Sequence, residues 1–267
     1  MPRTLTDGIQ WIQGCIPRPG LTADYVADPP DWYEPDREVH TCQNAYLVTG
    51  DRTLLFDTLS PANRDHVLAE LDHALGGRDL DYLVVSHPEA PHAGNAFAIL
   101  DAHPEATLVA PAHGNEHELY HLGDADRVAP GDTIDLGGKR VEFLQPLFLD
   151  HAMHIWLRET TTGTFFPVDW LGFPHMAGEC LTVVEELDHE VTVDQLLAFH
   201  GRVFFWYQYA DVAKTNGVVE ELADRHAEDI VAPAHGLPIT VDADRFIRRM
   251  ATVVEHVNER GRLDVFG

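Results

Sequence analysis

A short polar loop follows an apolar run in the stretch VVSHPEAPHAGN. It places two histidines, His87 and His92, on either side of one carboxylate, Glu89, within six residues. Loops at strand ends converge on ligand sites, so we expect a buried strand that opens directly onto such a site. Two imidazoles and a carboxylate are good donors for zinc, iron or manganese. The stretch therefore predicts a metal site at the edge of a sheet.

Histidine is common in this chain, at 17 of 267 residues, so spacing alone is weak evidence for a site. Seven histidines in helix-like or polar segments are interpreted as surface residues: His66, His73, His103, His189, His200, His226 and His256. Three later segments place candidate ligands near strand ends: Asp150, His151 and His154 in FLDHAMH, Asp169 in FFPVDWLG, and His235 in IVAPAHGLPI.

Hydrophobic periodicity predicts alternating strands and helices. Strands are expected at residues 8–15, 82–86, 106–110 and 229–232, with hairpins over 45–59 and 155–168. A helix should begin at Ser60 and Pro61, because a hydroxyl before a proline suits a helix start. Other helices are expected near 93–102, 193–200, 211–225 and 242–258, and one more carries His113, His117 and His121. The order indicates a layered α/β sandwich.

One short sequence, APAHG, occurs twice, at Ala110–Gly114 and Ala232–Gly236. Each copy follows a predicted strand, which favours two similar half-domains that end strands at the same edge of the sheet. His113, His117 and His121 follow at helical spacing. Such spacing can chelate metal, but a solvated helix face is the interpretation that we favour.

The charge is strongly negative, with 44 acidic against 18 basic residues and a formal net charge of −26. The acids are spread along the chain, which is typical of proteins kept soluble at high salt. A phosphate-binding surface must be basic, so nucleic acid and anionic membranes are excluded as partners. No transmembrane run or signal peptide is found, and we expect a cytoplasmic protein of a halophilic cell. The three cysteines show no motif and are expected to be reduced, buried thiols.

The loop resembles the metal-binding motif of the metallo-β-lactamase superfamily, in its flavodiiron branch. That branch carries HxExDHxG, and here His87-Pro-Glu89-Ala-Pro91-His92-Ala-Gly94 differs by Pro91 in place of the aspartate. Further segments resemble the family in the same order, over about residues 8–240: TCQNAYLV, LLFDTL, GDTIDLGGKRVEF, FFPVDWLG and VAPAHGLPI. The resemblance implies one domain over 1–267 with the four-layer αββα sandwich of the metallo-β-lactamase type.

The resemblance also implies the ligands of two metal ions. Metal one would take His87, Glu89 and His151, and metal two would take His92 and His235, with Asp169 bridging both. Asp150 or His154 could serve in place of His151. Pro91 cannot ligate through its side chain, so the second metal would be held more weakly or lost. Asp57 would lie beneath the site and orient a ligand histidine.

Iron is the metal that the resemblance favours, because Glu89 stands where most of the superfamily has histidine, although zinc or manganese could bind. The implied function is a non-haem di-iron protein that binds or reduces the small molecules O2 or NO. No flavin domain is expected in this chain, so electrons would come from an external protein. The alternatives are a zinc-type metallo-hydrolase and a non-catalytic oxygen-binding or sensor module. Family members often form dimers, so the resemblance also implies a homodimer for this chain.

Overall fold

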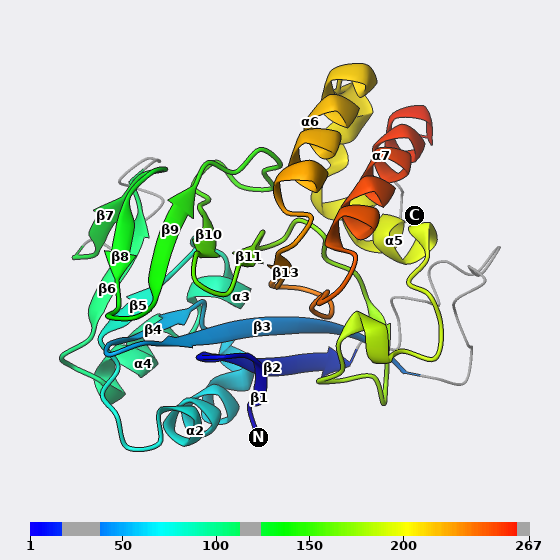
Figure 1. Cartoon of the computed structure of the whole chain (residues 1–267). Coiled ribbons are helices and arrows are strands. Elements are labelled where there is room, and N and C mark those ends of the chain that lie inside the picture. The colour runs from blue at the N-terminus through cyan, green and yellow to red at the C-terminus, as the bar shows by residue number, and fades with distance from the viewer. Residues whose placement is uncertain (18–37, 113–123, 261–267) are drawn as a thin grey trace. The chain divides into compact units, whose positions relative to one another are not determined.

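The computed structural model describes residues 1–17, 38–112 and 124–260 (Figure 1). The chain divides into two compact units, with residues 1–14 and 43–166 in unit 1 and residues 15–42 and 167–267 in unit 2. Strands and helices alternate, which confirms the predicted α/β class. Among the described residues, no helix has the length and apolar character needed to cross a membrane. The helix predicted to carry His113, His117 and His121 lies outside the described residues.

A mixed sheet runs through unit 1 in the order β1-β2-β3-β4-β5-β6-β7. Its strands are β1 Arg3–Thr6, β2 Ile9–Pro17, β3 Val39–Thr49, β4 Thr53–Phe56, β5 Tyr82–Val84, β6 Thr107–Pro111 and β7 Asp126–Val128. The β3–β4 pair is the predicted antiparallel hairpin, and β4 to β7 are parallel. Parallel strands end at the same edge of a sheet, so the loops after β4 and β5 open side by side.

Two helices of unit 1, α2 (Arg64–Leu75) and α4 (Ala96–Ala102), pack against this sheet (Figure 1). Their shared core contains Val67, Leu71, Leu75 and Ile99 from the helices and Ala45, Leu47, Leu55 and Leu83 from the strands. Each fully buried aliphatic side chain of this kind stabilises the fold by about 1.5–3 kcal/mol. Val67, Leu71 and Leu75 are therefore the inward-facing residues of α2.

The start of this helical segment differs from the prediction. The Ser60 side chain makes no capping hydrogen bond, and Pro61 begins a 3-10 helix, η1 (Pro61–Asn63), that precedes α2. The Ser60 backbone N–H donates to Gln43 Oε1 at 2.8 Å, so a side chain from β3 fixes the entry. The fixed φ of proline suits a 3-10 turn as well as an α-helix.

Unit 1 also contains a short helix, α3 (Ala90–Ala93), and four antiparallel strands. The strands are β8 Thr133–Asp135, β9 Arg140–Leu144, β10 Trp156–Glu159 and β11 Thr164–Phe166. The β10–β11 pair confirms the second predicted hairpin.

Unit 2 is largely helical, with α5 (Val193–Val203), α6 (Val212–Arg225) and α7 (Ala243–Arg260), and the 3-10 helices η3 (Val184–Glu186) and η4 (Phe205–Tyr209). Helix α7 packs against α5, α6 and η4 (Figure 1). It buries an apolar stripe: Phe246, Ile247, Met250, Val254 and Val257. The three predicted C-terminal helices are therefore confirmed.

Two short strands complete unit 2, β12 (His175–Met176) and β13 (Ile230–Val231). Strand β12 pairs with the first residues of β3, and Val231 bridges to Ile239. The two APAHG copies therefore follow strands of different kinds, since β6 lies inside the parallel part of the large sheet and β13 is not a strand of that sheet. The interpretation that both copies end strands at one sheet edge is wrong.

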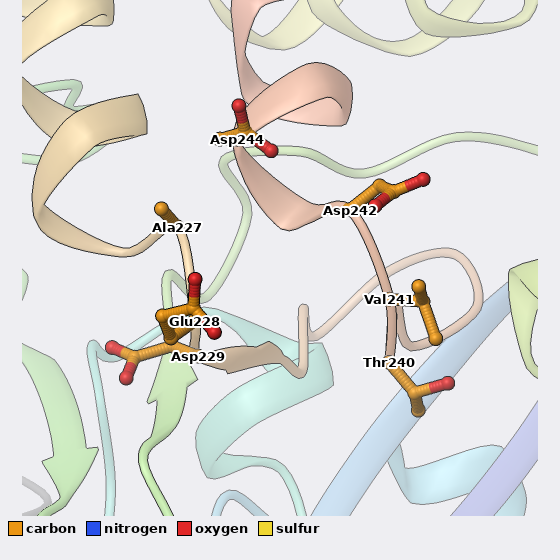
Figure 2. A pocket seen from close by; sticks show the side chains of 7 residues that line it. All are labelled: Ala227, Glu228, Asp229, Thr240, Val241, Asp242 and Asp244. Carbon is orange, nitrogen blue, oxygen red and sulfur yellow. The ribbon is translucent and has the colours of Figure 1, made fainter.

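A pocket of about 340 Å³ lies in unit 2 between the residues that follow α6 and the start of α7 (Figure 2). Four carboxylates line it: Glu228, Asp229, Asp242 and Asp244. The side chains of Asp229 and Asp242 point in opposite directions in Figure 2. Asp229 accepts a hydrogen bond from His226, and Asp244 pairs with Arg248. Asp229 and Asp244 therefore serve local structure.

Candidate metal centre

Asp57 follows β4 at the edge where the parallel strands end. Its φ of +64° is in the left-handed region, which is stable because the carboxylate is held at three points. The buried carboxylate accepts hydrogen bonds from the Ser86 N–H (2.8 Å), the Ser86 hydroxyl (3.0 Å) and His92 Nδ1 (2.7 Å). Asp57 thus accepts the predicted hydrogen bond from a candidate ligand histidine.

The protons of His87 and His92 follow from these bonds. Since the carboxylate of Asp57 can only accept, His92 carries its proton on Nδ1. The Ser86 hydroxyl donates to Asp57 and so accepts from His87 Nδ1 at 3.1 Å. Both rings are buried and their centroids lie 3.9 Å apart. Each therefore carries its lone pair on Nε2, the neutral form that binds metals.

Pro91 lies in the first turn of α3, whose N-cap residue is Glu89. Proline fits there because the first N–H groups of a helix have no partner within the helix. The Glu89 carbonyl accepts the N–H groups of His92 (3.0 Å) and Ala93 (2.8 Å). Pro91 thus contributes no ligand atom through its side chain, but it begins the turn that presents His92.

The loop with the third candidate ligand places His154 and Asp150 nearer to His87 than His151. The His154 ring stacks on His87 at 4.8 Å and 22°, while the His151 ring is 5.9 Å away. A donor atom of His87, one of Glu89 and one of Asp150 all lie within 4.8 Å of one another. His151 Nδ1 instead accepts the Met153 N–H at 3.1 Å.

His154 has the same proton arrangement as His87 and His92. Its Nδ1 donates to Asp150 Oδ1 at 2.8 Å, and its Nε2 is buried without a hydrogen bond among the described residues. A buried polar atom without a partner costs about 1–3 kcal/mol, which a bound cation would remove. This local geometry favours His154 or Asp150 over His151, the residue that the sequence favoured.

Asp169 and His235 lie together in unit 2, although 66 residues separate them in sequence. Asp169 sits in a tight turn between Val168 and Leu171, which have φ of +58° and +71°. His235 Nδ1 donates to the Cys42 carbonyl at 2.6 Å, so its Nε2 carries the lone pair. That Nε2 lies 3.1 Å from Asp169 Oδ1. Both atoms are acceptors, and a cation shared between them would satisfy both.

Two of the histidines interpreted as surface residues are buried, which is a correction. His200 donates from Nδ1 to the Leu196 carbonyl (2.9 Å) and accepts the Leu171 N–H on Nε2 (3.1 Å). Burial lowers its pKa to about 4, so the ring stays neutral and supports the Asp169 turn. His226 is buried against Asp229 at 2.8 Å. Their positions on the apolar faces of α5 and of the end of α6 were the available signal.

Each unit therefore offers donor atoms of the kind that iron binds. Unit 1 brings together His87, Glu89 and His92 with the loop that follows β9. Unit 2 brings together Asp169 and His235. Imidazole nitrogens and carboxylate oxygens suit iron, zinc or manganese, and the Nδ1 hydrogen bonds are those that orient metal-binding histidines. The residues present fit a metal centre.

Comparison with known proteins identifies the family. The model of the metallo-beta-lactamase superfamily matches residues 43–236. A nitric oxide reductase of Moorella thermoacetica is 24% identical over 266 residues, which cover 95% of this chain and 61% of the relative. A coenzyme F420H2 oxidase of Methanothermobacter marburgensis is 29% identical over 209 residues, covering 73% of this chain and 50% of the relative.

Solved structures show the same fold. The rubredoxin oxygen:oxidoreductase of Desulfovibrio gigas superposes with a TM-score of 0.70 at 21% identity, covering 97% of this chain and 61% of that chain. Flavodiiron proteins recur among the similar structures, which confirms the predicted resemblance and the fold type. This chain spans between about half and three fifths of the length of these relatives. The chain belongs to the metallo-beta-lactamase superfamily.

Proposed function

We propose that this chain binds iron and uses it to bind or reduce O2 or NO, with electrons from an external donor protein. The observation that carries the proposal is the set of oxygen donors around His87, where Glu89 and Asp150 lie within 4.8 Å of one another and of the ring. Carboxylate oxygens beside imidazole favour iron over zinc. The names of the relatives, a nitric oxide reductase and a coenzyme oxidase, agree with this chemistry.

We propose His87, Glu89, His92, Asp169 and His235 as ligands, with one residue from the 150–154 loop. The sequence favoured His151 for that role, whereas the geometry in unit 1 supports His154 or Asp150. Two irons are proposed, and the second would be held more weakly because Pro91 replaces a carboxylate. Iron, when bound, would supply the redox change and the position at which O2 or NO binds.

The protein's own residues would hold the ligands in place and keep water out. Asp57 and Ser86 fix the Nδ1 protons of His87 and His92, which keeps both Nε2 atoms available as ligands. Burial of both rings lowers the local dielectric and strengthens binding to a cation. These side chains transfer no proton in the proposed roles, which are to orient the ligands and to exclude water.

We also propose that this protein is adapted to high salt. The net charge of −26, spread along the chain, supports solubility and stability at high salt. A chain with so few basic residues would recognise its electron donor through a basic or a small neutral face of that donor.

The test is reduction of O2 and of NO by iron-loaded protein supplied with a chemical reductant in high-salt buffer. His87→Ala should abolish consumption, whereas His73→Ala, on the exposed side of α2, should not change it. Equal rates in the wild type and His87→Ala would refute the proposal. Consumption that is absent in iron-loaded wild type, with hydrolysis of an ester or lactam after zinc loading, would support the hydrolase instead.

A further inference from the structure

Four metal-binding side chains that are not among the proposed iron ligands converge in unit 2. They are Cys15 near the end of β2, His40 on β3, His175 on β12, and Cys180 shortly after β12. One donor atom from each lies within 4.8 Å of the donor atoms of the other three. The sequence does not predict this group, because the spacings between the four residues match no metal-binding motif.

Strand pairing explains how the two histidines meet. Strands β3 and β12 are antiparallel, with His175 directly opposite His40. Residues directly opposite in such a pair share one face of the sheet. Their rings accordingly meet edge to face, with centroids 5.8 Å apart. The pairing therefore fixes two imidazoles side by side before any metal is considered.

A tight turn brings Cys180 back to the same place. The Glu179 N–H donates to the Met176 carbonyl at 3.1 Å, and Gly178 has a φ of +99°. A positive φ at the third position of such a turn requires glycine or asparagine, and the sequence supplies glycine there. The turn returns Cys180 Sγ to 3.5 Å from His175 Nε2.

We propose that Cys15, His40, His175 and Cys180 form a second metal site that binds one zinc ion. Zinc bonds of about 2.3 Å to sulfur and about 2.0 Å to nitrogen give a tetrahedron whose edges measure about 3.3–3.8 Å. The observed distances lie within this range or slightly below it. Cys15 Sγ lies 3.3 Å from Cys180 Sγ and 3.8 Å from His175 Nε2. His40 Nδ1 lies 3.1 Å from Cys180 Sγ.

The charges and outer contacts also suit zinc. Two thiolates neutralise a divalent ion, and the pair of sulfur and pair of nitrogen ligands is typical of closed structural zinc sites. His40 Nε2 lies 3.8 Å from a Glu38 carboxylate oxygen, so a carboxylate lies near the ring at an ion-pair distance.

The proposed zinc would join segments that are far apart in sequence, since 165 residues separate Cys15 and Cys180. Closing so long a loop restricts the unfolded chain, and binding energy at such a site is folding energy. The site uses soft sulfur ligands, whereas the iron ligands proposed above are imidazole and carboxylate. The two metals are therefore distinguishable, and the zinc site depends on no part of the proposed function.

The test uses cobalt as a probe in the full-length protein, prepared anaerobically with a reductant. Cobalt bound to thiolate gives an intense charge-transfer absorption that imidazole and carboxylate ligands do not give. We expect this band in the wild type, in His87→Ala and in the control His73→Gln, an exposed histidine of α2. Cys15→Ser and Cys180→Ser should lose it, together with about one zinc per chain.

A second measurement needs no variant. Only the thiolate is alkylated readily, so one equivalent of zinc should slow iodoacetamide modification of Cys15 and Cys180 at least about tenfold. Peptide mass spectrometry would locate the modified cysteines. The proposal is overturned if the wild type shows no charge-transfer band, if zinc leaves both alkylation rates unchanged, or if the reduced, anaerobic protein contains a Cys15–Cys180 disulfide.

Discussion

Mild acid should weaken the fold through His200, a buried residue of α5 that supports the turn containing Asp169. Its neutral ring donates from Nδ1 to Leu196 and accepts the Leu171 N–H on Nε2. A second proton on Nε2 would face that N–H and break the contact. Burial lowers the pKa of His200 from its ordinary value of 6.5 to about 4, although the hydrogen bond to Leu196 and the Asp169 carboxylate oppose the shift.

The direction and magnitude of this pH effect follow from the protons that the folded and unfolded chains bind at His200. Between pH 6.5 and about 4 the unfolded chain binds a proton at His200 and the folded chain does not, so the folded state loses stability as the pH falls. At about 1.4 kcal/mol per pKa unit, the difference between the ordinary and the folded pKa of His200 lowers the free energy of unfolding by about 3 kcal/mol below pH 4 and by about 2 kcal/mol at pH 5. Above pH 6.5 this loss of stability is absent, because His200 is neutral in both the folded and the unfolded chain.

Urea unfolding at about pH 7.5 and about pH 5, in constant molar KCl, measures this difference. His200→Gln keeps an amide that can contact Leu171 but does not titrate. Its unfolding free energy should fall by about 2 kcal/mol less than that of the wild type over this range. His73→Gln, exposed on α2, is the control and should behave as the wild type. Equal pH dependence in the wild type and His200→Gln would refute the reasoning.

The other predictions concern the metal centre and salt. Pro91→Asp restores a carboxylate in the first turn of α3 and should lower the iron concentration needed for the second equivalent at least about tenfold, measured by iron titration; an unchanged titration would contradict the role given to Pro91. Asp57→Asn should weaken iron binding about 10–100-fold, because the hydrogen bond that orients His92 is altered, and unchanged affinity would contradict it. Unfolding free energy should rise from low to molar KCl because the charge of −26 is screened, and a flat dependence would exclude salt adaptation.

Much of the fold was predictable because its signals are local. The Gly50–Asp51 turn between two apolar runs gave the β3–β4 hairpin, and the apolar stripe from Phe246 to Val257 gave α7. The histidine environments were harder. His200 and His226 have polar side chains, so composition suggests the surface, but each is buried with its ring hydrogen bonds satisfied within a few residues. Burial of that kind depends on tertiary packing.

The residues of the candidate site also differ in how far the sequence predicts them. His87, Glu89 and His92 are close in sequence, and a family motif identifies them. The choice within the 150–154 loop depends on which ring packs against His87, which only the three-dimensional structure shows. The cluster of Cys15, His40, His175 and Cys180 was missed because β3–β12 pairing and a turn at Gly178 assemble it from distant residues.

The most direct test of the central proposal is the metal content of anaerobically prepared protein offered excess ferrous iron and one equivalent of zinc in high-salt buffer. We expect about two irons per chain in the wild type, loss of iron in His87→Ala, and retention of iron in His73→Ala. Zinc should be confined to about one equivalent, which Cys180→Ser removes. Wild-type protein that takes up no iron, or that keeps its iron in His87→Ala, would contradict the proposed iron centre.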